Sequence, residues 1–227
     1  MKSLVVPMLL VLTTAAAADN VDTGESVKAV YSFDIGSNVR WFGDTSAAIV
    51  TEDQLAGIRM TIGRSLTSAT LAHRSLDIGL FARWAYGGVS GTMFNNLDTS
   101  MSQNTLGGGV RIDAPLTRWF SVIGQGELGM ARTSLTVTRD EMTPVDDHQW
   151  APYAAASIGG DLRIINGHRL RSSLGVDVGY LFAVPVELHA LPGDRPAEDL
   201  SIATTFAGVG KLDTRGVTFS MSLRGAF

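Results

Sequence analysis

Charged side chains recur at alternate positions inside stretches that are otherwise apolar. In residues 76–86, Asp77 and Arg83 fall on one parity, while leucines and an isoleucine fall on the other. Successive side chains of a strand point to opposite faces, so such charges share a face. Asp113 belongs to this parity, and the other members of the predicted charge network are Asp34, Arg59, Asp77, Arg83, Arg111, Glu127, Asp161, Arg163, Arg171, Asp177 and Arg224. Acids and bases on one face can neutralise one another, so the pattern indicates an ion-pair network.

Eight stretches carry the alternation that would position these charges. They are residues 31–35, 58–62, 76–86, 106–113, 120–130, 154–164, 170–182 and 217–227. A tilted strand of ~9–11 residues crosses a bilayer, and none of the stretches has the period of a helix. We therefore predict an all-β chain of about eight strands.

The connections between these stretches alternate in length. Short ones span residues 67–73, 114–118 and 165–167, and long polar ones span 42–53, 89–102, 139–149 and 188–212. This is the pattern of periplasmic turns and extracellular loops, with both termini on the short-turn side. We expect residues 44–52, 91–101, 140–147 and 192–198 outside the cell. At the third short connection, pairing Ile164 with His168 predicts a three-residue loop and sets Asp161 opposite Arg171.

The polarity of the two faces distinguishes between kinds of barrel. A water-soluble eight-stranded barrel keeps polar side chains outside and apolar ones within, and its core could not hold so many charges. The alternation therefore predicts an eight-stranded antiparallel transmembrane up-and-down β-barrel with charges inside and apolar side chains toward lipid. Aromatic residues near the strand ends fit two interfacial belts. The predicted interface aromatics are Trp41, Trp84, Tyr86, Trp119, Trp150, Tyr153 and Tyr180.

The N-terminal end and the composition agree with an exported membrane protein. Lys2, an apolar run and three alanines before Asp19 predict a signal peptide over residues 1–18 and a barrel domain over 19–227. The chain has no cysteine and carries 18 basic and 22 acidic residues; loss of Lys2 would take the net charge from −4 to about −5. An acidic balance argues against nucleic acid. The composition is 45% hydrophobic with no long apolar run, as a transmembrane barrel requires.

Two segments carry a family resemblance. The alternating run 217–227 ends on Phe227, and a strand-final aromatic residue resembles the insertion signal of outer-membrane barrels. Residues 114–120 and the following run 124–129 resemble a turn and strand of small OmpA-like and OmpX-like outer-membrane β-barrels. The resemblance implies a bacterial outer membrane, contacts with its lipid and lipopolysaccharide, and assembly through Phe227 by the barrel-assembly machinery. Since the sequence ends with the last predicted strand, we expect no appended peptidoglycan-binding domain.

Other motifs give no site. Gly124, Gly126 and Gly129 match a dinucleotide fingerprint but lie inside a predicted strand with no helix after it. We interpret them, and residues 107–109, as space for large charged side chains in a narrow barrel. The tripeptide beginning at His73 is similar to the His-x-Ser of outer-membrane lipid A deacylases, but it lies at the expected periplasmic end. No two histidines have metal-ligand spacing, and residues 146–148 with His189 show no nucleophile–base order. We expect no catalytic residue, cofactor or metal.

The predicted function follows from the filled interior. An eight-stranded barrel has just enough room for side chains, which favours a plug of paired charges. Its central layer would contain Asp34, Arg59, Arg83, Glu127 and Asp177, with the other charges nearer the periplasmic rim. We expect a structural or surface-interaction role through four long extracellular loops, with an unidentified ligand. The alternatives are a narrow pore for small solutes or ions and, less favoured, a lipid-modifying enzyme.

Overall fold

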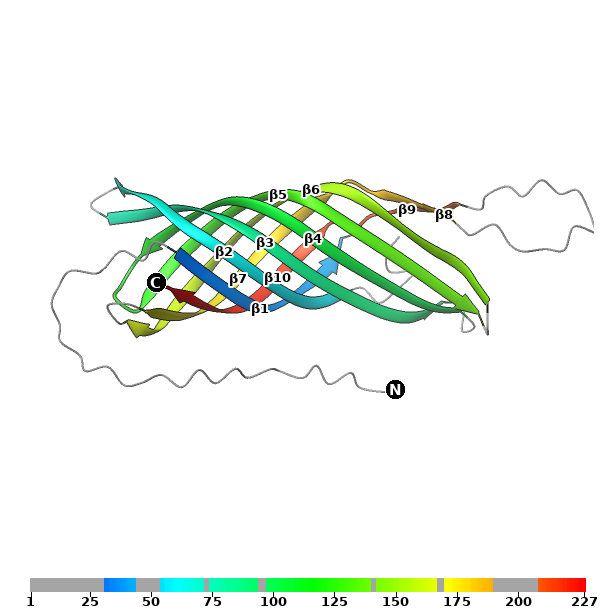
Figure 1. The fold of residues 1–227 in the computed structure, drawn as a ribbon, viewed down its shortest axis with the longest axis horizontal. Helices are drawn as coiled ribbons and strands as arrows, with labels where there is room; N and C mark the ends of the chain where they lie inside the picture. The colour runs from blue at the N-terminus through cyan, green and yellow to red at the C-terminus, as the bar shows by residue number, and fades with distance from the viewer. Residues whose placement is uncertain are drawn as a thin grey trace, which may run out of the picture.

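The computed structural model describes residues 31–43, 54–71, 74–93, 97–139, 142–166, 170–189 and 208–227 (Figure 1). These residues form ten strands. They are β1 (Tyr31–Phe42), β2 (Gln54–Leu71), β3 (Arg74–Met93), β4 (Leu97–Pro115), β5 (Phe120–Arg139), β6 (Met142–Asn166), β7 (Arg171–Ala183), β8 (Val186–His189), β9 (Gly208–Leu212) and β10 (Gly216–Ala226). The described residues contain no helix long and apolar enough to cross a membrane.

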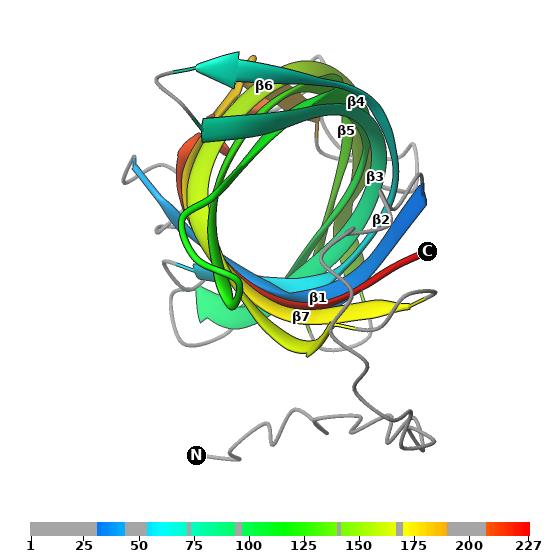
Figure 2. The ribbon, with the colours of Figure 1, turned by 90° about the vertical axis from the view of Figure 1, so that its left-hand side faces the viewer.

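Eight of the strands close into a barrel in the order β1-β10-β7-β6-β5-β4-β3-β2, and β8 pairs with β9 in a separate two-stranded sheet. Every pairing is antiparallel, and Figure 2 shows the closed ring along its axis. The prediction of an all-β chain with an eight-stranded antiparallel barrel is confirmed. At the seam, Tyr31 and Phe227 exchange two backbone hydrogen bonds of 3.0 Å. We call the end of the barrel that contains these two residues the turn end and the opposite end the loop end.

Strands β3 to β6 are the longest of the described strands, followed by β2 with 18 residues. They have 20, 19, 20 and 25 residues, whereas β1 has 12 and β10 has 11. Beyond the ladder pair of Ala56 and Gly88, β4 is the one ladder partner that β3 has among the described residues. These four strands therefore extend past the others at the loop end (Figure 1) as a sheet of residues 89–93, 97–101, 135–139 and 142–151, which we call the projecting sheet.

The projecting sheet corrects two loop predictions. Residues 89–102 and 139–149 were expected as long polar loops, but both belong largely to antiparallel hairpins. The ladders continue into these segments, from Val89 paired with Met101 to Met93 paired with Leu97, and from Thr133 paired with Gln149 to Arg139 paired with Met142. A third correction concerns 188–212, where Val186–His189 and Gly208–Leu212 form a hairpin instead of uninterrupted loop. Its side chains pack against interior-facing residues of the projecting sheet, in a cluster of Leu55, Met101, Leu135, Val137, Ala151, Val186, Leu188 and Leu212.

The register at the third short connection also differs from the prediction. Asn166 pairs with Arg171, and a shift between Arg163 and Ile165 sets Asp161 opposite Gly175. Asp161 therefore has a glycine as its ladder partner, not Arg171. This glycine leaves room for the carboxylate, because a Cβ at position 175 would lie 2.6 Å from Asp161 Oδ1. The carboxylate consequently turns across the barrel toward other strands.

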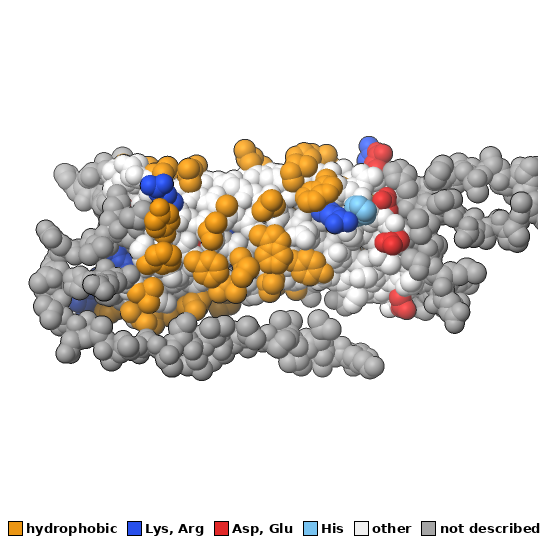
Figure 3. All heavy atoms as spheres, in the orientation of Figure 1, with side chains coloured by type: hydrophobic (Ala, Val, Ile, Leu, Met, Phe, Trp, Pro, Cys, Tyr) orange, Lys and Arg blue, Asp and Glu red, His pale blue; other side chains and the backbone are white. Residues whose placement is uncertain are grey.

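The outer wall is apolar. Its exposed large side chains include Leu128, Ile158, Leu106, Ile62, Leu162 and Ile164. Figure 3 shows the hydrophobic side chains spread over the middle and turn end of one face, with acidic side chains beyond them toward the loop end. Along β5 the pattern inverts: Leu128 and Met130 face outward in the lower part, whereas Leu135 and Val137 face inward in the projecting sheet. The predicted signal peptide and all of residues 44–53 and 190–207 lie outside the described residues.

Candidate functional site

The interior of the barrel holds three groups of paired charges, and the first joins β2 to β7. The guanidinium of Arg59 meets the carboxylate of Asp177 with both terminal nitrogens, Nη1 lying 3.0 Å from Oδ1 and Nη2 bonding Oδ2. Arg59 Nη2 also lies 3.3 Å from the hydroxyl of Ser222 on β10. A two-pronged contact of this kind fixes orientation as well as supplying attraction. The pair spans the lumen between strands that are not neighbours in the sheet.

The second group is a quartet of two arginines and two aspartates. Arg224 Nε donates to Asp34 Oδ1 over 2.8 Å, and Arg224 Nη1 donates to Asp161 Oδ2. Arg111 lies 3.6 Å from Asp34 and 3.5 Å from Asp161. The hydroxyl of Ser173 completes the site, 3.3 Å from Asp161 Oδ2. The formal charges of the four ionised side chains sum to zero, which is the condition under which buried charges can coexist.

The third group is centred on Glu127. Arg83 Nη1 donates to Glu127 Oε2 over 2.7 Å, and Arg83 also bonds Gln125 at 2.5 Å. The phenol of Tyr153 donates to the other carboxylate oxygen, Glu127 Oε1. Gly107 makes this contact possible, because a Cβ there would lie 2.3 Å from the Tyr153 hydroxyl and 2.6 Å from Glu127 Oε1. The carboxylate is thus held from two sides by a cation and a neutral donor.

Tyr153 corrects the sequence interpretation. It was predicted as an interfacial aromatic residue, but its side chain faces the lumen and is only 5% exposed. The signal was present in the sequence, since Tyr153 shares its parity with Ser157 and Asp161. The other predicted interface aromatics lie on the outer wall, where Trp41, Tyr86, Trp119 and Trp150 are exposed and Trp84 and Tyr180 are half-buried.

The predicted central layer is also corrected. Arg59, Asp177, Arg83 and Glu127 do form pairs, but Asp34 bonds with the charges expected nearer the periplasmic rim. Strand tilt brings Asp34 level with Arg224, its ladder partner on β10.

The remaining predicted charges lie nearer the turn end. Asp77 accepts a hydrogen bond from Ser68, and Arg163 Nη1 lies 3.5 Å from the carbonyl oxygen of Arg118. The side chain of Arg171 is half-buried there. This rim layer is therefore more open than the groups above it.

A polar layer above the charges was missed by the sequence prediction. Arg40 is buried and donates to Gln103, whose amide nitrogen lies 3.0 Å from Thr133 Oγ1 and 3.2 Å from Thr214 Oγ1. Thr214 lies between β9 and β10, so this layer ties the loop-end hairpin segment to the barrel wall. Arg40 shares its parity with Asp34, which is the signal that could have identified it.

The glycine interpretation holds only in part. Gly107 and Gly129 face inward, and a Cβ on either would meet the Tyr153 side chain. Gly124 and Gly126, in contrast, have nothing within 4 Å of a built Cβ. These two alternate with the inward-facing Gln125 and therefore face outward, so they make no room for interior charges.

The ion pairs can hold strands together across the lumen. Each group contains an ion pair between strands that are not neighbours in the sheet, and breaking one partner of a buried pair would cost roughly 3–5 kcal/mol. Several buried atoms, among them Asp34 Oδ2 and Asp161 Oδ1, have no hydrogen-bond donor within the part of the chain that the structure describes. Buried groups of this kind are ordinarily satisfied by water, so the lumen has polar positions for solvent.

No group of three or more metal-ligating residues occurs among the described residues. His148 is exposed, and its backbone N–H donates to Asp147 Oδ1 over 2.7 Å. The side chains of His73, His168 and His189 lie outside those described.

No protein-family model matches the chain, and no curated protein is similar to it in sequence. Solved structures with a similar fold include Ail, the attachment invasion locus protein of Yersinia pestis, at 12% identity and a TM-score of 0.48, covering 88% of this chain and 98% of that one. Ail in complex with the heparin analogue sucrose octasulfate has the same identity and coverage and a TM-score of 0.47. The β domain of the Bordetella autotransporter BrkA is 10% identical with a TM-score of 0.42, covering 88% of this chain and all of that one.

Proposed function

We propose that this chain is an outer-membrane β-barrel of a Gram-negative bacterium, closed by its own interior charges, that contacts ligands outside the cell through its loop end. The observation that carries this proposal is the polarity of the wall. Leu128 on the outside is 70% exposed, whereas Asp34 on the inside is 1% exposed. An apolar belt of this extent is unfavourable in water and favourable in lipid, and charges are then sheltered in the lumen.

The orientation follows from the connections. The turn end, with its short connections and both barrel termini, would face the periplasm, and the projecting sheet would extend from the cell surface. Its exposed polar side chains include Asp98 and Asp146.

Export and assembly are part of the proposal. Residues 1–18 would act as the signal peptide, and Phe227 as the insertion signal read by the assembly machinery. In support, the Phe227 ring is 62% exposed on the outer wall while its backbone is held by Tyr31. Deletion of Phe227 should lower the amount of heat-modifiable barrel in the outer-membrane fraction. Wild-type assembly of that deletion would remove this role.

Cysteine labelling on intact cells tests the orientation. A cysteine at Asp146 should react with an impermeant thiol reagent, and one at Ala69, near the short connection between β2 and β3, should not. Labelling at position 69 with none at 146 would invert the topology. Cofractionation with soluble proteins would reject the membrane assignment altogether.

A narrow ion pore is the second candidate, favoured by the buried oxygens Asp34 Oδ2 and Asp161 Oδ1, which accept no hydrogen bond from the described residues. Purified protein in planar bilayers decides between them: a plugged barrel should show at most brief openings, whereas a pore should conduct steadily. A lipid-modifying enzyme remains the third candidate. An altered mass of lipid A on expression of the protein would support it against the surface-interaction role.

A further inference from the structure

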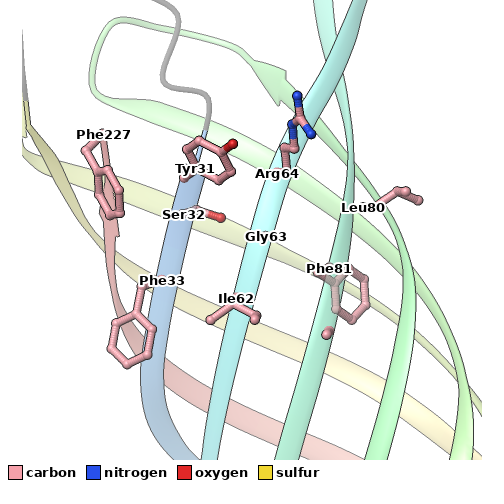
Figure 4. Close-up of a pocket in the computed structure, with 10 residues that line it drawn as sticks. Tyr31, Ser32, Phe33, Ile62, Gly63, Arg64, Leu80, Phe81 and Phe227 are labelled. Carbon is pink, nitrogen blue, oxygen red and sulfur yellow. The ribbon is translucent and has the colours of Figure 1, made fainter.

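An apolar groove crosses the outer wall at the turn end of β1, β2 and β3. Its volume is about 970 Å³, and it opens to the surface. Figure 4 shows Tyr31, Phe33 and Phe227 on one side of the groove and Leu80 on the other, with Ile62 and Arg64 between them. This volume is within the range of ~300–1,000 Å³ typical of ligand sites. The groove is unusual because it lies on the outside of the barrel.

The strand register explains the depression. On the outer face Ile62 is paired with Ala82, and Ala82 with Gly108. The next outward row toward the turn end contains Arg64, Leu80 and Val110 in ladder positions. Two small residues in succession thus lower the wall beside a row of large ones. An extended hydrocarbon chain could lie over Ala82 with large side chains on both sides.

A cation stands at the mouth of this groove. Arg64 is exposed, and its guanidinium carbon lies 5.7 Å from the centroid of the Tyr31 ring. No carboxylate pairs with Arg64 in the ranges that the structure describes, whereas Arg59, Arg83, Arg111 and Arg224 in the lumen are all ion-paired. Aromatic rings and arginines at a barrel rim lie at the level of lipid headgroups. Arg64 therefore combines an available positive charge with a position beside an apolar furrow.

We infer that the groove binds a single phospholipid of the periplasmic leaflet. Arg64 binds the headgroup phosphate, and one acyl chain lies in the furrow over Ala82, between Ile62 and Leu80. The site rests on the proposed membrane location, since only there does the groove face lipid. Charge and shape agree on this occupant, because a guanidinium matches phosphate geometry and the rest of the lining is almost wholly apolar.

Native mass spectrometry of the detergent-solubilised full chain tests the inference, with palmitoyl-oleoyl phosphatidylglycerol as the probe. The wild type should hold one lipid at the lowest concentrations. Arg64→Ala should weaken this binding about tenfold, as expected for loss of a charge-assisted hydrogen bond. Ala82→Trp, which fills the furrow, should abolish it. Glycerol phosphate, which has no acyl chain, should not displace the lipid.

Matched controls occur on the same barrel. Arg118 stacks on Trp119 at 5.1 Å, as Arg64 does on Tyr31, but lies outside the groove. Ala156 faces outward on β6, away from the groove. Arg118→Ala and Ala156→Trp should therefore bind lipid as the wild type does. If Arg118→Ala loses as much lipid binding as Arg64→Ala, or if Arg64→Ala binds lipid as well as the wild type does, the lipid is bound without a specific site. Either result would overturn the inference.

Two further readouts separate the possible failures. Heat-modifiable migration and outer-membrane fractionation report whether each variant is a folded membrane barrel. If these hold and the specific lipid is absent, the inference fails while the proposed function stands; if the wild type is not in the membrane, both fail. If the wild type is a dimer and Ala82→Trp disrupts it, the groove binds a second copy of the chain, and the inference of a lipid site is overturned.

Discussion

The two halves of the barrel interior are built on opposite chemistry. Near the turn end the lumen contains Arg–carboxylate groups such as Arg224 with Asp34, whereas in the projecting sheet it contains Leu135, Val137 and Met101. Strands β3 to β6 run through both halves, with the same parity facing inward. What changes is the outside, which is apolar around the charged half and polar around the other.

The contrast between the two halves indicates that the medium around each half determines whether its inward side chains are charged or apolar. In the proposed membrane location, the charged half would lie in lipid, so its apolar side chains point outward and the polar parity is left within. The projecting sheet would lie in water, and it buries its apolar side chains inward against the β8–β9 hairpin, as a soluble protein does. The inversion between Met130 and Leu135 on β5 would then mark the outer boundary of the lipid-facing belt.

Removing a charge from the lower half should have the largest effect. Asp34→Ala leaves Arg224 and Arg111 without one of their carboxylates, so the free energy of unfolding should fall by roughly 3–5 kcal/mol. Denaturant titration of the barrel in micelles measures it. Asp98→Ala, an exposed acid of the projecting sheet, is the control and should change little. Equal stability of both variants would mean that the lower half is filled with water and that its ion pairs are not needed.

Adding a charge to the outside should separate the two halves. Leu128→Arg puts an arginine on the lipid-facing wall and should destabilise the barrel by about 2–4 kcal/mol. Thr136→Arg makes the same change on the same face of β5 in the projecting sheet, where it should be nearly neutral. Folding yield into vesicles reports both. A similar penalty at the two positions would contradict a lipid boundary between them.

Leu135→Ala should loosen only the upper half. Leu135 is fully buried in the apolar cluster, so the cavity should cost about 2 kcal/mol, at the low end of its class because the β8–β9 hairpin can settle into the space. Hydrogen exchange should accelerate in β8, β9 and the projecting sheet while the seam between β1 and β10 stays protected. Faster exchange throughout the barrel would show that the halves unfold as one unit.

Tyr153→Phe should lower stability by about 1.5 kcal/mol, because the ring still packs and only the hydrogen bond to the Glu127 carboxylate is lost. Tyr86→Phe is the matched control, since Tyr86 is exposed on the outer wall. A larger loss of stability in Tyr86→Phe than in Tyr153→Phe would contradict the buried hydrogen bond and favour the original prediction that Tyr153 is an interfacial residue. Thermal unfolding followed by gel shift is sufficient to rank the two.

The smallest effect concerns Asp213, which lies beyond the barrel at the loop end. Burial alone would raise the pKa of Asp213, but hydrogen bonds from the side chain and backbone of Arg215, and its charge, lower this pKa below the ordinary 3.8. A lowered pKa means that the bond stabilises the segment above the ordinary pKa and is lost as the pH falls through the folded value. A carboxyl NMR titration should give a pKa below 3.8; a value above it would contradict the pairing. Because Arg215 is half exposed, the effect on stability should be slight.

Much of the barrel could be predicted from the sequence because alternation is a local signal. Each of the eight barrel strands is recognisable in the sequence by apolar residues at every second position. The sequence alone therefore predicts that Arg59, Arg83 and Glu127 face inward. The continuation of β5 past Arg132 escaped the same reasoning. There the apolar residues change parity, as Met130 faces outward and Leu135 inward, and a change of parity is hard to distinguish from the end of a strand.

Which charges meet could not be predicted, because it depends on strand tilt and stagger. Arg59 and Asp177 lie on strands that are not neighbours, so no ladder register joins them. The packing of β8 and β9 against the projecting sheet is likewise non-local. Leu188 and Leu212 are buried in a cluster with Leu135, which is far from both in the sequence, so no local pattern predicts their burial. Tyr153 was misplaced for a different reason: its ring suggested an interface, although its parity placed it within.

The seam has a consequence for the kinetics of assembly. Asp34 and Arg224 are 190 residues apart in the sequence, yet they form the bond next to the line where β1 meets β10. Contacts between residues so far apart in the sequence form late in folding, because ordering the long intervening chain costs conformational entropy before its ends can meet. Ring closure should therefore be the slow step, and an intermediate with paired β2–β7 and an open β1 edge should accumulate before it. Such an edge must be shielded from other chains until β10 arrives.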